Sequence, residues 1–412
     1  MRNMKNNSAW LAQQAMHGYN MSTVKLSYKY RLYPNQEQVA KLRSNFAFCC
    51  FLYNCALQER NDHYKRYGKG VSYAGQCKAL PDIKREFTEQ TLSIYSQSLQ
   101  QVLKRLDRSY QNFFRRIKAK ASEAGFPRYR SFDRYNSVVF PQSDLKGGGV
   151  RLTDNNKLTI FGIPGDVKVK WHRPFQGRCK QVMIKKQGNK FYLIVSCDDV
   201  PSEHLAKTGK TIGIDLGISS FITADDGTKF HHPKPYKTAK EKLAYLNQRL
   251  AAKQRGSNNR KRAKQSLARA YEKVSNIRND FLHKAAKQLV AENDTIVIEK
   301  LNVKGMLEAK GFEVSKSNIQ DASWARFASL LLYKAERAGR IVIEVDPRNT
   351  SKTCSGCAKV KDNLTLRDRT YDCDACGIAI DRDINAAINI KALGTSAAIT
   401  KVISEAHDFS HE

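Results

Sequence analysis

The first clear pattern along the chain is an alternation of apolar and cationic side chains over residues 24–32. This period of two predicts a half-exposed strand with one basic face. Asn35, followed three residues later by Gln38, is typical of a helix N-cap with its capping partner. A helical spacing of apolar residues then continues to about Tyr67, and Gly68 ends it. The N-terminal region therefore predicts one strand followed by one long helix.

A second helical pattern covers residues 87–122, after a mixed segment at 71–83 that Pro81 is expected to break. Cationic residues lie between the apolar ones, and such a mixture can hold a nucleic-acid backbone while aromatic rings stack on bases. A packed aromatic stripe under a solvated helical face is the alternative interpretation. The side chains expected to form the core stripe are Leu92, Tyr95, Leu99, Val102, Leu106, Tyr110, Phe113, Phe114 and Ile117.

Short strand patterns replace the helical ones over residues 150–200, after a glycine run at 147–149. A Gly-Asn pair at 188–189 is a hairpin turn between the last two strands. If strand 24–32 pairs with this unit, the helical region 35–145 is an insertion into a β barrel. The expected strands cover residues 157–160, 167–171, 181–185 and 191–197.

Two short β-branched runs in the second half of the chain each carry a carboxylate at their end. Asp215 lies in the first run, at 211–216, and a further strand is expected at 219–223. Glu299 ends the second run, at 295–299. A helix over 319–338 and a strand over 341–345 follow, so that strand, helix and strand alternate as in an α/β sheet. This order predicts an RNase-H-like fold.

Residues 238–290 predict a long helical hairpin that is broken at 256–259. Between Lys237 and Lys287 there are fifteen Lys and Arg residues against three Asp and Glu residues. A pair of surface helices with solvated charges is one interpretation. The sign bias favours a hairpin that faces a duplex or an RNA, because solubility alone is served by mixed charges.

The whole chain has 412 residues and a formal charge of +32, which favours salt-dependent binding to polyanions. It contains no apolar stretch of about 18 residues, so no membrane span is expected. The first residues lack the apolar core of a signal peptide. Residues 1–20 are interpreted as an extension before a start at Met21, and residues 391–412 are expected to fray.

The ten cysteines fall into two groups. Cys354 and Cys357 form one Cys-x-x-Cys pair, and Cys373 and Cys376 form another after fifteen residues, which is the spacing of a four-thiolate zinc ribbon. Two disulfides or redox pairs are the alternative. Four thiolates leave no open position for catalysis, so one structural Zn²⁺ is expected. The other six are expected to be buried thiols: Cys49, Cys50, Cys55, Cys77, Cys179 and Cys197.

A third carboxylate, Asp383, opens the alanine-rich helical stretch at 381–390. Together with Asp215 and Glu299 it could hold two divalent cations, which clamp the attacking and leaving oxygens of a phosphodiester. Asp381 competes with Asp383 for this role. The residues alone therefore predict a metal-dependent nuclease or transferase. The remaining acidic candidates, Asp225, Asp226 and Asp346, are expected to be turn or cap residues.

The chain resembles the transposon-encoded TnpB proteins, which are compact relatives of the type V CRISPR effector nucleases. The likeness covers nearly all of residues 22–395. Its most specific part is the double Cys-x-x-Cys ribbon followed by Asp-Arg-Asp-Ile-Asn-Ala-Ala-Ile-Asn-Ile at 381–390. Further motifs that carry it are Gly-Ile-Asp-Leu-Gly (213–217), Ile-Glu-Lys-Leu (298–301), Arg-Leu-Tyr-Pro-Asn (31–35), Ser-Leu-Gln-Gln-Val-Leu-Lys-Arg-Leu (98–106), Asn-Phe-Phe-Arg-Arg (112–116) and Gly-Phe-Pro-Arg-Tyr (125–129).

The resemblance implies an RNA-guided DNA endonuclease that cuts double-stranded DNA beside a short motif, with a guide RNA derived from the transposon end. Its RuvC-type site would use two catalytic Mg²⁺ ions held by Asp215, Glu299 and Asp383, and Asp383 is preferred to Asp381 because it precedes x-Asn-Ala-Ala. A monomeric ribonucleoprotein in the bacterial or archaeal cytoplasm, associated with the nucleoid, is expected. A transposase of RNase-H-like fold and a guided repressor without cleavage are the alternatives. The intact acidic trio argues against the repressor.

The resemblance also implies a domain order and a set of nucleic-acid contacts. The expected domains are a disordered extension (1–21), a β-barrel wedge (22–34 and 146–203), a helical recognition domain (35–145), a RuvC-like nuclease domain (204–352), the zinc ribbon (353–377), a RuvC-like C-terminal helix (378–395) and a tail (396–412). By similarity, Tyr73 and Gln100 face the motif DNA. The cationic candidates for nucleic-acid binding are Lys104, Arg105, Arg115, Arg116, Arg128, Arg260, Lys261, Arg262, Lys264 and Arg269.

Overall fold

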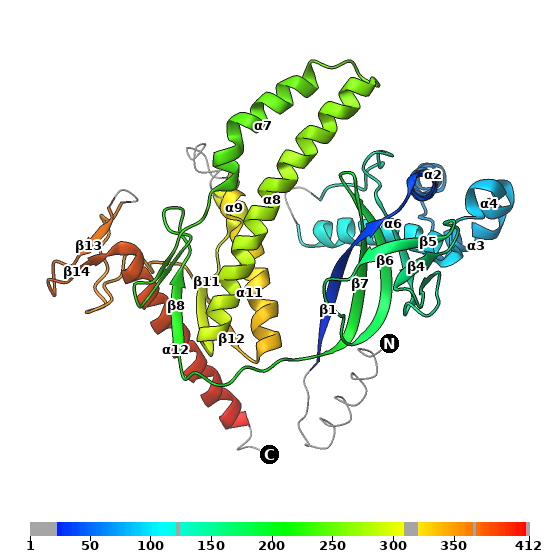
Figure 1. Ribbon diagram of the computed structural model, residues 1–412. Coiled ribbons are helices and arrows are strands. Elements are labelled where there is room, and N and C mark those ends of the chain that lie inside the picture. Colours follow the sequence, from blue (N-terminus) through cyan, green and yellow to red (C-terminus); the bar gives the residue numbers. More distant parts are fainter. Residues whose placement is uncertain (1–22, 121–123, 309–319, 366–367, 409–412) are drawn as a thin grey trace. The chain divides into compact units, whose positions relative to one another are not determined.

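The computed structural model describes residues 23–120, 124–308, 320–365 and 368–408. The chain divides into two compact units, Met1–Pro201 and Ser202–Glu412, and Figure 1 labels their elements. The extension predicted over residues 1–21 lies outside the described residues. No helix in the described part of the chain has the length and apolar character needed to cross a bilayer.

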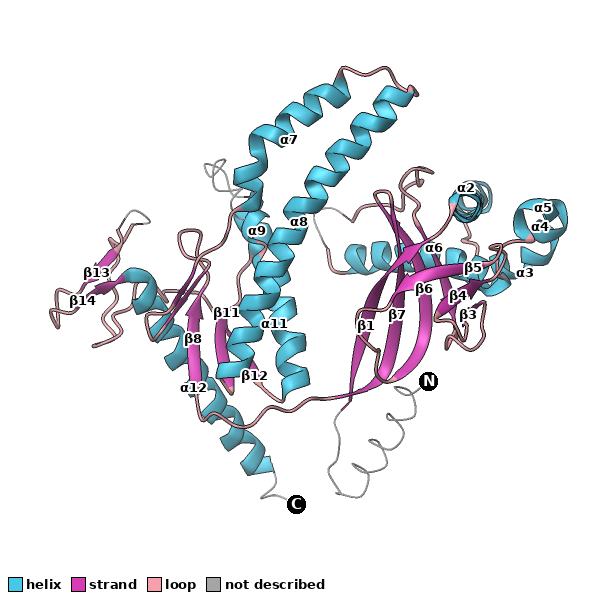
Figure 2. Cartoon of the chain, in the orientation of Figure 1, coloured by secondary structure: helices cyan, strands magenta, loops and turns pink. Residues whose placement is uncertain are grey.

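The first unit is built on a seven-stranded sheet in the order β2-β6-β7-β1-β5-β4-β3, which Figure 2 shows as a curved layer of strands. The N-terminal strand pairs antiparallel with both β7 and β5, which confirms that strand 24–32 joins the β unit. None of the described strands joins β2 to β3, so the sheet approaches a barrel without the pairing that would close it. The strands are β1 (Thr23–Tyr33), β2 (Ser137–Pro141), β3 (Val150–Leu152), β4 (Lys157–Ile160), β5 (Asp166–Lys170), β6 (Arg178–Gln187) and β7 (Lys190–Pro201).

Helices occupy the chain between β1 and β2. The longest, α2 (Gln36–Tyr67), begins at the predicted capping box of Asn35 with Gln38 and ends at Gly68, which has φ 65°. The others are α3 (Tyr73–Lys78), α4 (Leu80–Glu86), α5 (Thr88–Thr91) and α6 (Ser96–Lys118).

The mixed segment at 71–83 is divided between α3 and α4, and Pro81 lies in the first turn of α4, where its missing N–H is not needed. Other expectations for this region are wrong. The expected helix over 87–122 is interrupted between α5 and α6. Leu92 lies at this break and is 70% exposed. Phe114 and Ile117 lie beyond Leu106, the last buried residue of α6, and are 59% and 50% exposed instead of lying in the core. Strand β2 lies inside the range expected to be helical.

The second unit contains a mixed five-stranded sheet in the order β10-β9-β8-β11-β12. Strands β8 (Thr211–Asp215), β9 (Ile222–Ala224) and β10 (Lys229–Phe230) form an antiparallel meander. Strands β11 (Thr295–Glu299) and β12 (Ile341–Val345) run parallel to β8. The predicted meander, followed by strand, helix and strand, is therefore present.

Helices cover both faces of this sheet. On one face, Ile296 and Ile298 of β11 pack with the helices α8 (Asn258–Glu292) and α11 (Trp324–Ala338). On the other face, Val297 packs with Ile390 of α12 (Arg382–Asp408). Alternate residues of a strand point to opposite faces, so the apolar run of β11 is buried on both sides.

Helix α12 approaches the sheet closely at two glycines. A Cβ atom at Gly213 of β8 would lie 2.3 Å from the carbonyl oxygen of Ala387, and one at Gly394 of α12 would lie 2.4 Å from Val297. Real Cβ atoms essentially never approach other atoms this closely, so both positions require glycine. The helix continues to Asp408, which corrects the expectation that residues after 391 have little regular structure.

The predicted cationic hairpin is formed by α7 (Pro235–Ala251) and α8, which pack together. Ser257 caps α8, because its hydroxyl accepts the backbone N–H of Arg260 at 3.1 Å. Apolar side chains along α8 are only partly buried: Val274 lies inside, but Tyr271 and Ile277 are exposed. The short helix α9 (Val303–Glu308) follows β11.

Candidate active site and zinc ribbon

Asp215 and Glu299 lie at the carboxyl ends of two neighbouring parallel strands. Ile214 of β8 is the register partner of Ile298 of β11, so the two carboxylates follow a paired position. Asp215 lies two residues after Gly213, and Glu299 lies two residues after Val297. Both Gly213 and Val297 lie against α12. Because side chains alternate along a strand, both carboxylates face the side of the sheet that α12 covers.

Asp383 lies in the first turn of α12, on that same side of the sheet. Asp381, its competitor, is already occupied: its Oδ1 accepts the backbone N–H groups of Asp383 and Ile384 at 2.9 and 3.2 Å, and its Oδ2 lies 2.7 Å from Lys229 Nζ. Burial alone would raise the pKa of Asp381, but these hydrogen bonds lower it overall. Asp381 therefore caps the helix, and Asp383 is the carboxylate left to face Asp215.

The pKa of Asp215 indicates that the three acids interact electrostatically. Burial, and after it the nearby charges of Glu299 and Asp383, together raise the pKa of Asp215 to about 8, against a lowering effect of Arg382. Burial also raises the pKa of Glu299. Carboxylates that repel one another in a poorly solvated place are stabilised by a cation, and carboxylate oxygens are the donors that Mg²⁺ prefers. The donor set therefore fits divalent cations.

Thr350, which lies in none of the sequence motifs, holds Glu299 in place. Its hydroxyl donates to Glu299 Oε1 at 2.5 Å, and the Glu299 side chain is almost fully buried. The backbone of Thr350 is fixed in turn by Asn389 of α12, whose Nδ2 donates to the carbonyl oxygens of Thr350 and Thr353 at 2.9 and 2.7 Å. Second contacts of this kind orient the carboxylates that bind metals.

The same loop leads directly into the ribbon. Asn385 of α12 donates to the Thr353 carbonyl at 2.8 Å and accepts the Ser355 N–H at 2.9 Å, on either side of Cys354. The two asparagines of the 381–390 motif thus bind the ribbon's first knuckle to the helix that carries Asp383. The motif itself was the available signal for this role, since its asparagines recur at a spacing of four on one helix face.

The four cysteines converge as predicted, beside the small hairpin of β13 (Thr370–Asp372) and β14 (Ala379–Asp381). Their Sγ atoms all lie within 4.8 Å of one another, and those of Cys354 and Cys376 are 3.6 Å apart, as are those of Cys357 and Cys373. Tetrahedral zinc with Zn–S bonds of about 2.3 Å implies a spacing of about 3.8 Å. The donor set fits one Zn²⁺ ion.

Among the described residues, these cysteines are the only set of three or more His, Cys, Asp and Glu side chains that close together. Asp215, Glu299 and Asp383 do not form so close a cluster, and they affect one another electrostatically rather than by direct contact. Of the six cysteines outside the ribbon, Cys49, Cys50, Cys179 and Cys197 are buried as expected and Cys77 is partly buried. Cys55 is exposed, which corrects its assignment to the core.

Two of the three acids expected to be turn residues, Asp226 and Asp346, have that role, whereas the side chain of Asp225 links β8 to α12. Asp225 accepts the Gly213 N–H at 2.8 Å and pairs with Lys391 at 2.6 Å. Asp226 and Asp346 each accept a backbone N–H two residues later.

Some cationic candidates for nucleic-acid binding are committed to contacts within the protein. Arg260 donates to the carbonyl oxygens of Leu250 and Lys253, both at 2.7 Å, and so closes the C-terminal end of α7. Arg105 lies over the ring of Tyr135, and Arg116 donates to the Gly125 carbonyl. The remaining candidates with exposed side chains are Gln100, Lys104, Arg115, Arg128, Lys261, Arg262, Lys264 and Arg269, whereas Tyr73 is half-buried against the core.

Comparison with known families gives three matches along the chain. Residues 193–310 match a family described as "Probable transposase", residues 324–390 match "Cas12f1-like, TNB domain", and residues 21–69 match "Helix-turn-helix domain". The described part of this last segment consists of β1 and the single helix α2.

Two relatives cover most of the chain. A Streptomyces pristinaespiralis protein named "Putative RNA-guided DNA endonuclease" is 33% identical over 92% of this chain and 91% of its own length. An Escherichia coli K12 protein named "Putative RNA-guided DNA endonuclease InsQ" is 29% identical over 89% of this chain and 92% of its own. Among solved structures, the one titled "Cryo-EM structure of the Cas12f1-sgRNA-target DNA complex" aligns with a TM-score of 0.56 and 15% identity, covering 90% of this chain and 99% of that one. This likeness concerns the fold alone.

Proposed function

We propose, from the premise that this chain belongs to the TnpB family, that it is an RNA-guided DNA endonuclease. The observation that carries the proposal is the position of Asp215, whose pKa is raised by burial and by the charges of Glu299 and Asp383. The guide RNA would come from the end of a transposon, and the target would be double-stranded DNA beside a short motif.

Asp215, Glu299 and Asp383 would hold two Mg²⁺ ions, which when bound supply activation of water and stabilisation of the leaving oxygen. The protein's part is to hold these three carboxylates. Thr350 fixes the orientation of Glu299 by its hydrogen bond, and Asp381 fixes the first turn of α12 and with it the position of Asp383. No protein nucleophile is required.

The ribbon would hold one structural Zn²⁺ and no reacting group. Residues 204–352 and 378–395 would form the RuvC-type nuclease, residues 35–145 the recognition region, and the sheet of the first unit the wedge. The exposed members of the nucleic-acid set would contact RNA or DNA, in a monomeric ribonucleoprotein.

The first experiment expresses the chain with its native flanking DNA, purifies it and sequences the RNA that comes with it. One RNA species with a constant scaffold and a short variable end is expected, and it names the DNA to test. With that DNA and Mg²⁺, the wild type should cut, and Asp215→Ala should bind but not cut. Asp226→Ala, on an exposed turn, is the matched control and should cut as wild type does.

Three other outcomes would contradict the proposal. Cutting by Asp215→Ala at the wild-type rate would show that the site is elsewhere. Guided binding without cutting by the wild type would indicate a repressor. Joined DNA products, with random RNA or none, would indicate a transposase.

A further inference from the structure

Four aromatic rings form an exposed cluster at the C-terminal end of α6. Tyr110, Phe113 and Phe114 lie at helical spacings of three and four, so they share one face of the helix. Phe126, from the segment after the helix, packs against Tyr110 and Phe113. We call these four residues the aromatic platform. Phe114 is 59% exposed and Phe126 is 48% exposed.

The rings of the platform are already arranged as a surface. Tyr110 and Phe114 are stacked with centroids 6.2 Å apart, and Phe126 stands edge-on to Tyr110 at 5.6 Å and to Phe113 at 5.2 Å. Rings that hold one another in this way lose little conformational freedom when a flat ligand binds to them.

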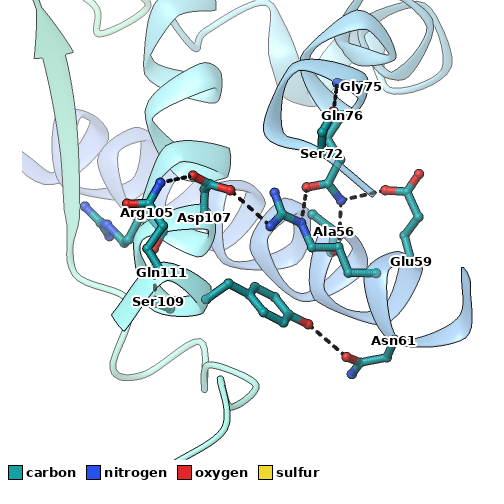
Figure 3. Close-up of polar contacts among 12 residues, drawn as sticks. Ala56, Glu59, Asn61, Ser72, Gly75, Gln76, Arg105, Asp107, Ser109 and Gln111 are labelled. Atoms are coloured by element: carbon teal, nitrogen blue, oxygen red, sulfur yellow. Dashed lines mark hydrogen bonds and ion pairs between the residues drawn. The ribbon is translucent and has the colours of Figure 1, made fainter. Parts of the chain in front are cut away.

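A buried polar network supports the platform from below. The Tyr110 hydroxyl donates to Asn61 Oδ1 at 2.9 Å, and the Arg60 guanidinium lies over the Tyr110 ring at 5.2 Å. Arg60 is itself buried, and it donates to Gln76 at 2.9 Å and to Asp107 at 3.2 Å. Figure 3 shows the polar contacts of Asn61, Gln76 and Asp107. The network joins α2, α3 and α6, so the ring of Tyr110 has a fixed position.

The segment that carries Phe126 is also tied down. Arg116 of α6 donates to the Gly125 carbonyl at 3.2 Å. Further along, Asn54 of α2 accepts the Arg130 N–H at 2.8 Å and donates to its carbonyl at 2.9 Å. The exposed face of Phe126 therefore belongs to an ordered surface.

The charge around the platform selects the kind of partner. Residues 108–134 contain eight Lys and Arg residues against two Asp and Glu residues. Arg115, directly after Phe114 in the sequence, and Arg128, two residues after Phe126, are exposed. An apolar surface within so basic a segment is suited to a ligand that is both flat and anionic. Nucleobases stack on aromatic rings while cationic side chains follow the phosphates, and unpaired RNA bases are commonly held in this way.

We propose that the aromatic platform is a binding site for an unpaired base of the RNA that this protein carries. Phe114 and Phe126 provide the stacking surface, and Arg115 and Arg128 contact the flanking phosphates. The proposal rests on the proposed function, which supplies the RNA, and it adds a site at which one base is held by stacking rather than by charge alone.

The test uses the full chain and a single-stranded 12-nucleotide oligoadenylate RNA in which one adenine is replaced by fluorescent 2-aminopurine. Stacking on the platform should quench the probe. The double variant Phe114→Ala/Phe126→Ala should lose the quenching and bind roughly tenfold or more weakly. Its affinity should keep the wild-type salt dependence, because the phosphate contacts remain. Phe114→Trp should retain both quenching and affinity.

Tyr64→Ala is the matched control, since Tyr64 is 63% exposed on α2 and is not part of the platform. It should behave as wild type. Thermal unfolding of each variant identifies any loss of fold. If the alanine variant unfolds, Phe114→Leu keeps the test decisive, because it removes the ring at this exposed position, keeps its apolar bulk and should also lose the quenching.

Wild-type quenching and affinity in the folded double variant would overturn the proposal. Platform-dependent quenching of the matching deoxyadenylate strand, equal to or stronger than that of the RNA, would overturn its assignment to RNA. Guided DNA cutting is measured separately. If the protein never cuts but its RNA binding depends on Phe114 and Phe126, the proposed function fails and the site stands.

Discussion

Replacing Asp215 with asparagine should stabilise the metal-free protein while it abolishes DNA cutting. In the unfolded chain this carboxyl has a pKa near 3.8, whereas in the folded protein burial, Glu299 and Asp383 raise the pKa to about 8. The folded state therefore binds the proton more tightly than the unfolded state does. The resulting stability is fully present below pH 4 and is lost progressively as the pH rises from about 4 to about 8.

The size of the effect follows from the interval between the two pKa values. At pH 7 the carboxyl of Asp215 is ionised in the unfolded chain and must take up a proton when the protein folds. This pH lies about 3 units above the unfolded pKa of 3.8. Each unit corresponds to about 1.4 kcal/mol, which gives about 4 kcal/mol. Because the Asp215 side chain keeps some exposure to solvent, this figure is an upper bound. Asparagine carries no charge at any of these pH values, so the variant avoids this cost.

The assay is denaturant unfolding of wild type and Asp215→Asn at several pH values between 4 and 8, without added Mg²⁺. The two proteins should have similar stability near pH 4, and the difference should grow in favour of the variant up to about pH 8. Adding Mg²⁺ should then stabilise the wild type and have little effect on the variant, since a ligand stabilises only the state that binds it.

Asp226→Asn is the control, because Asp226 is an exposed turn residue whose hydrogen bond asparagine can also accept. It should follow the wild-type pH profile. If Asp215→Asn follows that profile too, Asp215 is not held among like charges, and the argument for a shared cation site is refuted.

Three further outcomes are expected. Thr350→Val should reduce the rate of DNA cutting roughly 10- to 100-fold with zinc content unchanged, because the loss of a hydrogen bond to a carboxylate costs about 1.5–3 kcal/mol. Thr350→Ser keeps the hydroxyl and should retain most of the wild-type rate. Equal rates for the two variants would contradict the role of Thr350 in positioning Glu299. Cys354→Ser should lower bound zinc below one per chain and lower the thermal midpoint, as metal analysis and calorimetry would measure, whereas unchanged zinc would exclude this ligand. Arg260→Ala should lower the thermal midpoint, because it opens the end of α7. Arg262→Ala should leave the thermal midpoint unchanged and reduce the salt dependence of RNA binding by about one phosphate contact. A lower midpoint for Arg262→Ala together with a reduced salt dependence for Arg260→Ala would exchange the two roles.

Much of the second unit could be predicted from the sequence because its patterns are local. The β-branched runs before Asp215 and Glu299 are strands buried on both faces, and the cysteine spacing predicts a ribbon directly. The convergence of Asp383 with the other two acids stays a long-range prediction, which depends on Asp383 opening a helix after the ribbon.

Other features depend on neighbours that a sequence pattern does not identify. The apolar period over 87–122 predicts Leu92 and Phe114 in the core, but Leu92 lies at the break before α6 and Phe114 lies beyond the buried part of α6. Arg260 looked like one more cation in a basic run, and only the fold brings it to the end of α7. Thr350 is a common polar residue in a loop, and its role follows from a contact with a residue 51 positions away.

The close seating of α12 on the sheet has a consequence for how this protein is made. Asp215 and Glu299 emerge from the ribosome before Asp383 and the helix that packs at Gly213. A nascent chain therefore carries its basic helices well before it has a complete acidic trio. We expect a growing chain to be able to engage RNA before it can cut DNA, so that the order of synthesis itself delays the nuclease until its guide can be in place.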